Sequence, residues 1–406
     1  MKEDVKKIGV LKPLHSFRND AWKCVKCKVC SMANPQEVKN YRFSSNCISG
    51  SYYFYEGYYP PGRFEIVRAL TLDPPEIEIT QEVIKIVYNC TLCGWCQTIC
   101  GEMKDLEPTN AFMALREYLV RNGFGPLPAH LEFIKSIKNY DNPWNYPRVQ
   151  RDRWTKKIDA EVKDATKEEV DILYFVGCTG SYDPGFQEVT FSTVKILSRY
   201  GFKVGILGRN ERCCGSTMLR VGEVQEFERR KAEILQQLNE VKAKFLVTAC
   251  AGCYSTFKHS YQDKLNKPVL HMVEFLKKIM EEKGIKFREG IHKRITYHDP
   301  CHLGRYFGIY DVPREIISSI PDIEFVEMER IKERSWCCGA GGGVRSGNPE
   351  LAFNTALERI NEAEYYGAEW LVTACPFCEQ NLREASKSKN GPAVKDLISI
   401  VAEIME

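Results

Sequence analysis

The sequence predicts a mixed α+β and α/β fold, in which an N-terminal helical domain is followed by two tandem α/β units with mainly parallel sheets. Three observations support this fold class. The second half of the chain repeats itself, short apolar runs alternate there with helical patterns, and a cysteine-free stretch at 101–170 separates the 18 cysteines into two zones. We expect the helical domain at 1–135, a linker at 136–168, and the two units at 169–290 and 291–406.

The internal repeat appears as matching segments at spacings of 123 to 125 residues, which indicates a duplicated unit. The matches are KFLVTACAGC (244–253) with EWLVTACPFC (369–378), Cys213–Cys214 with Cys337–Cys338, and Cys178 with Cys301.

Each unit shows the alternation that is typical of a parallel α/β fold. The apolar runs at 171–177, 203–208 and 245–249 predict buried strands, and the longer amphipathic segment at 224–241 predicts a helix. In both units the strand that ends in LVTA leads directly into a C-x2-C pair. Open α/β sheets bind their ligands at the carboxyl ends of strands, so we expect the functional site there.

The N-terminal domain gives a weaker pattern. Residues 110–120 carry Phe112, Leu115 and Leu119 on one helical face. The basic segment at 139–154, which is rich in proline and asparagine, follows that helix and indicates a linker.

The composition is that of a globular protein, with 44% hydrophobic residues, 27% charged residues and a net charge of +3. No run approaches the roughly 18 apolar residues of a membrane helix, and the N-terminus lacks a signal-peptide core. We therefore expect a cytoplasmic protein, with docking on the inner face of the membrane through a partner left open. Nucleic-acid binding is not expected, because no aromatic and basic strand motif accompanies the charge.

The cysteines occur in tight C-x2-C groups, which indicates metal binding in a reducing compartment and not a disulfide framework. The first zone has the spacing of a ferredoxin that holds two [4Fe-4S] cubane clusters, in which the last cysteine of each run binds the cluster of the other run. Cys100 should then complete the first set. The runs are Cys24, Cys27 and Cys30, then Cys90, Cys93, Cys96 and Cys100.

The first run departs from this pattern because Asn34, followed by Pro35, takes the place of its fourth cysteine. Either Asn34 or the remaining Cys47 completes the second cluster. We expect Cys47, because a thiolate suits iron better than an amide oxygen. Zinc is the alternative metal, but it prefers separated cysteine pairs to triplets.

The second zone contains two sets of five cysteines with the same order. Adjacent cysteines rarely suit a zinc tetrahedron, whereas they can bridge several metals of a larger cluster. We expect Gly215 and Gly339 to let the backbone approach such a group. No cysteine is left over once two sets of four and two sets of five are assigned. The sets are Cys178, Cys213, Cys214, Cys250 and Cys253, then Cys301, Cys337, Cys338, Cys375 and Cys378.

Three further motifs give the chain a specific resemblance. YHDPCHLGR (297–305) and SWCCGAGGGV (335–344), with the paired CCG motifs, resemble the B subunit of heterodisulfide reductase or the second half of its D subunit. The N-terminal cysteines and YYPPGR (58–63) resemble the C subunit or the first half of D. The resemblance implies that each five-cysteine set holds a noncubane [4Fe-4S] cluster and that both clusters face a disulfide.

This family implies an enzyme that acts on sulfur groups as one subunit of a complex. Its substrate would be a disulfide, such as CoM-S-S-CoB of archaeal methanogenesis, or the corresponding thiols. The electron donor would be a membrane cytochrome b-type subunit or a flavoprotein. No flavin or NAD is expected on this chain, since no dinucleotide fingerprint follows a strand.

A similar architecture occurs in iron–sulfur subunits of glycolate and lactate dehydrogenases and in partners of electron-transfer flavoproteins. The alternative function is therefore a non-catalytic relay between a flavin dehydrogenase or electron-transfer flavoprotein and a membrane quinone or cytochrome.

The repeats differ around their leading cysteine, where His298, His302 and Arg305 have no counterparts in FVGCTGSY (175–182). One hypothesis is that His298 or His302 gives a proton to a thiolate product and that Arg305 pairs with an acidic substrate group. The alternative is that these residues hydrogen bond cluster sulfurs or the backbone and tune the reduction potential.

Positive charge is concentrated at 1–42 and 134–157, which carry net charges of +6 and +5. These residues either offset the charge of the clusters or form a basic docking face for an electron donor.

Overall fold

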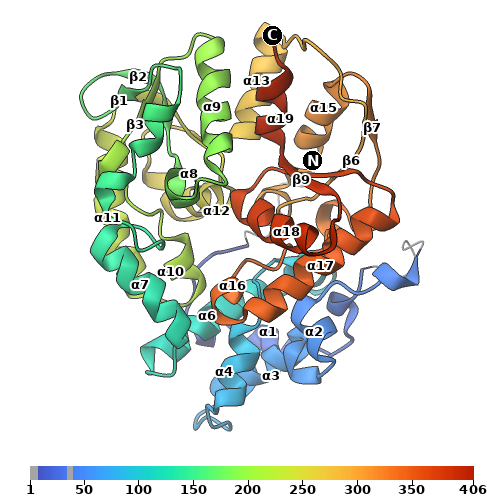
Figure 1. Ribbon diagram of the computed structural model, residues 1–406. Coiled ribbons are helices and arrows are strands. Elements are labelled where there is room, and N and C mark those ends of the chain that lie inside the picture. The colour runs from blue at the N-terminus through green and yellow to red at the C-terminus, as the bar shows by residue number, and fades with distance from the viewer. Residues whose placement is uncertain (1–7, 34–39) are drawn as a thin grey trace.

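The N-terminal helices lie below two α/β units that stand side by side (Figure 1). We analysed a computed structural model of the chain, which describes residues 8–33 and 40–406. Asn34 lies outside the described residues. No helix in the described part is both long and apolar enough to cross a membrane.

The first unit is built on a five-stranded parallel sheet with the order β1-β3-β2-β4-β5. The central strands β2 and β4 are buried, as expected for a sheet covered by helices. The strands are β1 (Lys163–Asp164), β2 (Val170–Tyr174), β3 (Val204–Ile206), β4 (Ala243–Thr248) and β5 (Val269–His271). The helices are α8 (Gly177–Tyr182), α9 (Gln187–Arg199), α10 (Ser216–Arg220), α11 (Val224–Glu240), α12 (Ala251–Thr256) and α13 (Met272–Lys283), with the short turns η7 (Gly208–Asn210), η8 (Phe257–Tyr261) and η9 (Gln262–Lys264).

The second unit has the same strand order without an equivalent of β1. Its parallel sheet runs β7-β6-β8-β9, which corresponds to β3-β2-β4-β5 and agrees with the duplication inferred from the sequence. The strands are β6 (Lys293–Tyr297), β7 (Ile323–Phe325), β8 (Trp370–Thr373) and β9 (Ala393–Asp396). The helices are α14 (Gly304–Phe307), α15 (Asp311–Ser319), α16 (Val344–Gly347), α17 (Pro349–Tyr365), α18 (Pro376–Lys389) and α19 (Leu397–Ile404), with η10 (Lys332–Arg334).

The described N-terminal residues are helical, and their only extended pairing is an isolated bridge between Met32 and Ser45. Phe64 of α3 and Phe112 of α6 pack edge to face, with ring centroids 5.4 Å apart. The elements are η1 (Leu14–Phe17), α1 (Arg18–Lys23), η2 (Val29–Ser31), η3 (Tyr41–Phe43), α2 (Ile48–Tyr53), η4 (Glu56–Tyr58), α3 (Pro60–Leu70), α4 (Gln81–Tyr88), α5 (Trp95–Lys104), α6 (Pro108–Arg121) and α7 (Pro128–Tyr140).

Residues 136–168, which the sequence set apart as a linker, are largely packed against the rest of the chain. They contain the end of α7, η5 (Arg148–Gln150), η6 (Arg153–Lys157) and β1. Trp154 is buried and β1 pairs with β3. The prolines and asparagines therefore form turns within a folded segment.

The fold brings the cysteines of each unit to the carboxyl ends of two neighbouring strands. Cys178 and Cys250 follow β2 and β4, and Cys301 and Cys375 follow β6 and β8. In α/β proteins this edge of the sheet is where ligands bind.

Candidate functional site

The ten cysteines of the repeats form one continuous series in which each thiol shifts the pKa of the next. The two five-cysteine sets, the first-repeat site and the second-repeat site, meet where Cys250 lies beside Cys375. The order of contacts is Cys178, Cys213, Cys214, Cys253, Cys250, Cys375, Cys378, Cys338, Cys337 and Cys301.

Hydrogen bonds from neighbouring thiols favour the thiolate form of Cys214 and Cys337. Hydrogen bonds from Cys213 and Cys253 lower the pKa of Cys214 to about 6, even though burial opposes this shift. Cys337 also has a lowered pKa, because Cys301 and Cys338 hydrogen bond it. The thiolate is the form that binds iron, so the series is suited to ligation.

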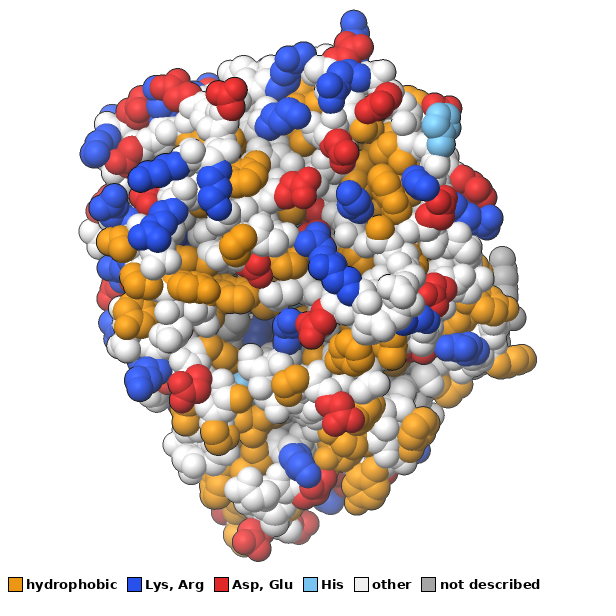
Figure 2. All heavy atoms as spheres, viewed as in Figure 1, with side chains coloured by type: hydrophobic (Ala, Val, Ile, Leu, Met, Phe, Trp, Pro, Cys, Tyr) orange, Lys and Arg blue, Asp and Glu red, His pale blue; other side chains and the backbone are white. Residues whose placement is uncertain are grey.

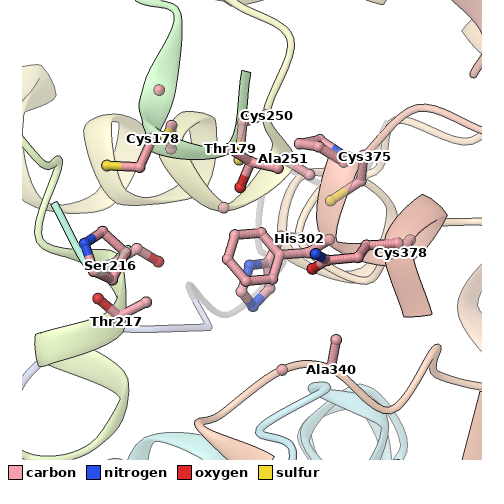
Figure 3. Close-up of a pocket in the computed structure, with 18 of the residues that line it drawn as sticks. Cys178, Thr179, Ser216, Thr217, Cys250, Ala251, His302, Ala340, Cys375 and Cys378 are labelled. Atoms are coloured by element: carbon pink, nitrogen blue, oxygen red, sulfur yellow. The ribbon is translucent and has the colours of Figure 1, made fainter. Parts of the chain in front are cut away.

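A cavity of about 380 Å³ lies between the two cysteine sets. Figure 3 shows Cys178 and Cys250 on one side of it, Cys375 and Cys378 on the other, and His302 between them. Figure 2 shows a hollow in the middle of this face of the molecule. The lining extends beyond the cysteines to Phe133, Trp144, Arg220, Arg345, Phe377 and Gln380.

Arg220 is the buried cation of this cavity. Its guanidinium donates to Tyr306 Oη at 2.9 Å and to Ser255 Oγ at 3.3 Å, and its Nε has no partner in the described structure. An unpaired buried cation is costly unless something negative approaches it. Arg345, by contrast, donates to Glu384 at 2.8 Å.

The three predicted catalytic residues occupy different places. His302 lines the cavity and packs on Tyr306, with ring centroids 4.7 Å apart. His298 is buried away from the cavity lining, and its Nδ1 accepts from Arg359 at 3.3 Å. The third residue, Arg305, points toward the N-terminal domain.

Arg305 donates to backbone carbonyl groups and does not line the cavity. It donates to the Glu333 oxygen at 2.7 Å, to the Cys93 oxygen at 3.3 Å and to the Ser335 oxygen. Its guanidinium is therefore placed between the second repeat and the N-terminal cysteines.

The N-terminal cysteines form two groups of four. The outer site contains Cys30 and Cys100, whose thiols hydrogen bond each other, and Cys24 and Cys27 beside them. Cys27 is exposed to solvent. Cys100 thus lies beside the first run, and its assignment as the fourth ligand of that cluster stays a prediction.

The inner site contains Cys47, Cys90, Cys93 and Cys96, which line one small cavity. Cys47 lies near Cys90. The inner site also adjoins the second repeat, because Cys93 lies close enough to Cys301 and Cys337 to influence their charges.

Close backbone contact joins the inner site to the second repeat. Gly342 has φ +62°, and an added Cβ would lie 2.6 Å from the carbonyl oxygen of Cys90. Only glycine permits this approach without strain.

Gly215 and Gly339 are needed where the cysteine loops pack on neighbouring helices. Both have positive φ, and an added Cβ would meet Phe227 at 2.5 Å or the carbonyl oxygen of Ala352 at 2.6 Å. These glycines allow the cysteine loops to pack against α11 and α17, and their approach to an inorganic group stays a prediction.

Comparison with known proteins identifies the family. The model of the CCG cysteine-rich domain matches residues 172–258 and 295–383. The D subunit of dihydromethanophenazine:CoB–CoM heterodisulfide reductase from Methanosarcina mazei is 37% identical over 352 residues, covering 84% of this chain and 83% of that protein.

The chain belongs to the CCG iron–sulfur oxidoreductase family that includes the D subunit of heterodisulfide reductase.

Other members of the family differ in their reported activities. The heterodisulfide reductase D subunit from Methanosarcina barkeri is 38% identical over 347 residues, covering 82% of this chain and 81% of that protein. EtfAB:quinone oxidoreductase from Syntrophomonas wolfei is 28% identical over 360 residues, covering 84% of this chain and 50% of that protein. Among solved structures, glutamate racemase RacE1 from Bacillus anthracis aligns with 58% of this chain at 15% identity, and its TM-score of 0.30 is too low to indicate a shared fold.

The residues of the repeats fit the iron–sulfur clusters of a heterodisulfide reductase D-like protein. All 18 cysteines are described and none forms a disulfide. His298 Nε2 is buried without a hydrogen-bond partner, and one ring nitrogen of His298 lies within 4.8 Å of the sulfurs of Cys338 and Cys378. A buried N–H in this place suits a cluster sulfur as its acceptor.

Sequence reasoning on this heterodisulfide reductase D-like chain missed Arg151 and Glu211. Arg151 donates to Cys178 Sγ at 3.6 Å and to Glu211 Oε1 at 2.5 Å, and Glu211 Oε2 accepts from Val176 N at 3.0 Å. Arg151 lies in the stretch interpreted as a linker. The one available signal was the charged pair that precedes Cys213 in ERCCG.

Proposed function

We propose that this chain reduces a disulfide, or oxidises a thiol pair, as one subunit of an iron–sulfur oxidoreductase complex. The observation that carries the proposal is the cavity that both five-cysteine sets line together. Its wall includes Trp144, Phe377 and Arg220, none of which is needed to bind a cluster. Such a wall suits a small molecule with an apolar chain and an acidic group.

The outer and inner sites would each hold a cubane [4Fe-4S] cluster, and the two repeat sites would each hold a noncubane [4Fe-4S] cluster. When bound, these clusters supply electrons, of which one disulfide needs two for conversion to two thiols, together with two protons. Because both repeat sites face one cavity, a disulfide there has a cysteine set on either side.

The chain's own residues would bind and orient the substrate. Arg220 would attract an acidic group, since its Nε is unpaired and none of its hydrogen bonds goes to a carboxylate. His302 is the one predicted catalytic residue on the cavity wall, and its ring would hydrogen bond a substrate sulfur. The buried His298 would instead hydrogen bond the second-repeat cluster.

Electrons would enter at the outer site, because its Cys27 is exposed. They would continue through the inner site, which adjoins the second repeat. The donor would be a membrane cytochrome b-type subunit or a flavoprotein.

The decisive experiment combines metal analysis with electron paramagnetic resonance (EPR) on protein purified without oxygen. We expect roughly 16 iron atoms and as much acid-labile sulfide per chain. Adding a candidate thiol to the oxidised protein should create a new paramagnetic signal. Few iron atoms together with bound zinc would refute the cluster assignment.

A relay without its own substrate is the second candidate function, and the similarity to EtfAB:quinone oxidoreductase favours it. Full iron content without any thiol-dependent signal would support the relay and refute disulfide chemistry. Replacement of His302 by Gln would then leave electron transfer from donor to acceptor unchanged.

A further inference from the structure

The buried arginines of this protein fall into two classes. Nine arginines are buried in the described structure. Five of them bind a carboxylate, namely Arg151, Arg230, Arg314, Arg330 and Arg359. The other four donate only to neutral groups of the described residues, namely Arg63, Arg116, Arg220 and Arg305. Buried charges without a counter-charge are rare, so the positions of these four arginines indicate where a negatively charged group would bind.

Arg116 contacts the backbone of the inner site. Its Nη2 donates to the carbonyl oxygen of Cys90 at 2.5 Å and its Nη1 to that of Gly342 at 2.6 Å. Arginine keeps its proton at neutral pH even where it is buried. This helix residue therefore places a full positive charge where the inner site meets the second repeat.

Arg63 lies on another side of the same site and is the last residue of the YYPPGR motif. It donates to the oxygens of Ile86 at 2.9 Å, Tyr58 at 2.7 Å and Ser49 at 2.9 Å. Arg63 also lines the small cavity that the inner-site cysteines share.

Arg305 reaches the inner site from the second repeat through its hydrogen bond to the Cys93 oxygen. Two of these arginines thus donate to backbone oxygens of inner-site cysteines, Cys90 and Cys93, and the third, Arg63, lines the same small cavity.

The outer site has a different charge environment. Glu65 lies near Cys24, whereas Lys104 lies near Cys100. Glu65 is itself paired with Lys26 at 3.2 Å and Arg68 at 3.0 Å. The charges near the outer site are therefore mixed in sign, partly exposed and open to screening by water and salt.

We propose that Arg63, Arg116 and Arg305 hold a cluster in the inner site at a higher reduction potential than a cluster in the outer site. The proposal rests on the cluster assignment made under the proposed function. Reduction adds one negative charge, which a fixed cation in a low-dielectric interior stabilises. Hydration also favours reduction of the exposed outer site, but three unscreened guanidinium groups outweigh it. Electrons would then move inward and be held beside the second-repeat site.

The wild-type protein tests this order directly. An EPR-monitored redox titration of the anaerobically purified chain should resolve two cubane signals with different midpoint potentials. The Cys27→Ser variant assigns them, because a changed ligand at the exposed position perturbs only the outer signal. We expect the unperturbed signal to have the higher potential. Equal potentials, or a higher potential for the signal that Cys27→Ser perturbs, would overturn the proposal.

Charge variants test the cause. Arg63→Gln, Arg116→Gln and Arg305→Gln should each lower the inner potential and leave the outer one unchanged. At a fixed solution potential the ratio of reduced to oxidised inner cluster should fall about tenfold, which corresponds to about 59 mV for one electron. The Lys variants at the same positions keep the charge and should recover most of the shift, which a purely structural role would not predict.

Arg121 provides a matched control on the same helix as Arg116. It is exposed and paired with Glu117. Arg121→Gln removes the same charge from α6 and should leave both potentials unchanged. If it shifts the inner potential as much as Arg116→Gln does, the proposal fails.

The two proposals can fail separately. A missing thiol-dependent signal, with the two cubane potentials in the expected order, refutes the disulfide reaction and leaves the arginine effect intact. Equal cubane potentials in a protein that gives the thiol-dependent signal refute the arginine effect alone.

Discussion

Cys250 and Cys375 lie beside each other across the boundary between the two repeats, and each shifts the pKa of the other. Each is the first cysteine of a C-x2-C pair that follows a central strand, β4 or β8. The contact brings the carboxyl ends of two separate sheets to a common centre. Loss of either cysteine should therefore affect its own repeat first and the shared cavity second.

Replacing Cys375 by Ser tests this arrangement. We expect the chain to lose about four of its roughly 16 iron atoms, because one five-cysteine set becomes incomplete. The cubane signals should persist, since their cysteines lie in the N-terminal domain. Metal analysis and EPR of the same sample measure both effects. Ser216→Ala, which changes another residue of the cavity wall, should retain all the iron, and an unchanged iron content in Cys375→Ser would contradict the assignment.

Replacing Arg220 by Gln tests substrate binding. The KM for an acidic disulfide should rise by about ten- to a hundredfold, because a hydrogen bond to a charged group contributes about 1.5–3 kcal/mol. The KM for a neutral disulfide of similar size should change little. Arg345→Gln is the control, since Arg345 is already paired with Glu384. Equal effects on acidic and neutral disulfides would argue against a charge-recognising role.

Replacing Gly342 by Ala tests the contact between the inner site and the second repeat. The added Cβ meets the Cys90 carbonyl oxygen at 2.6 Å, and φ is +62°. The variant should be destabilised by more than the roughly 1–2 kcal/mol of a left-handed alanine. Gly123 has φ +77° with nothing within 4 Å, so Gly123→Ala measures the backbone strain alone. Denaturant unfolding without oxygen compares the two, and equal losses of stability would show that the contact is unimportant.

Removing iron tests the role of the unpaired arginines in holding the domains together. Without clusters, Arg63, Arg116 and Arg305 lose the negative charge of the inner cluster and keep only neutral hydrogen-bond acceptors, and a buried charge without a counter-charge costs several kcal/mol. Hydrogen exchange should therefore increase in α6 and at 90–96 when a chelator strips the metal. Helix α13 packs against β4, β5 and α15 and serves as the internal control. A uniform increase along the whole chain would indicate general unfolding instead.

The repeats could be predicted from the sequence because the spacing of their cysteines and the apolar pattern of each element can be seen within short segments. The strands at 171–177, 203–208 and 245–249 correspond to β2, β3 and β4, and the helix at 224–241 corresponds to α11. Each of these segments carries its own hydrophobic period, so no knowledge of distant contacts is needed.

The charged residues of the site could not be predicted in the same way. Arg116 donates to Gly342, which lies 226 residues further along the chain. Its acceptors are backbone carbonyl groups, which leave no mark on the sequence. Arg151 was hidden for a related reason, since a proline- and asparagine-rich stretch resembles a linker until its buried Trp154 is seen.

The tandem arrangement of the repeats also bears on how the two halves can diverge. A homodimer built from one such unit would have to change both halves with every substitution. In a single chain, the first half can keep Arg151 and Glu211 beside its leading cysteine while the second carries His302 and Arg305. Because the two repeats are in one chain, the second can acquire residues that contact the N-terminal domain. The first can keep different residues around its own cysteines.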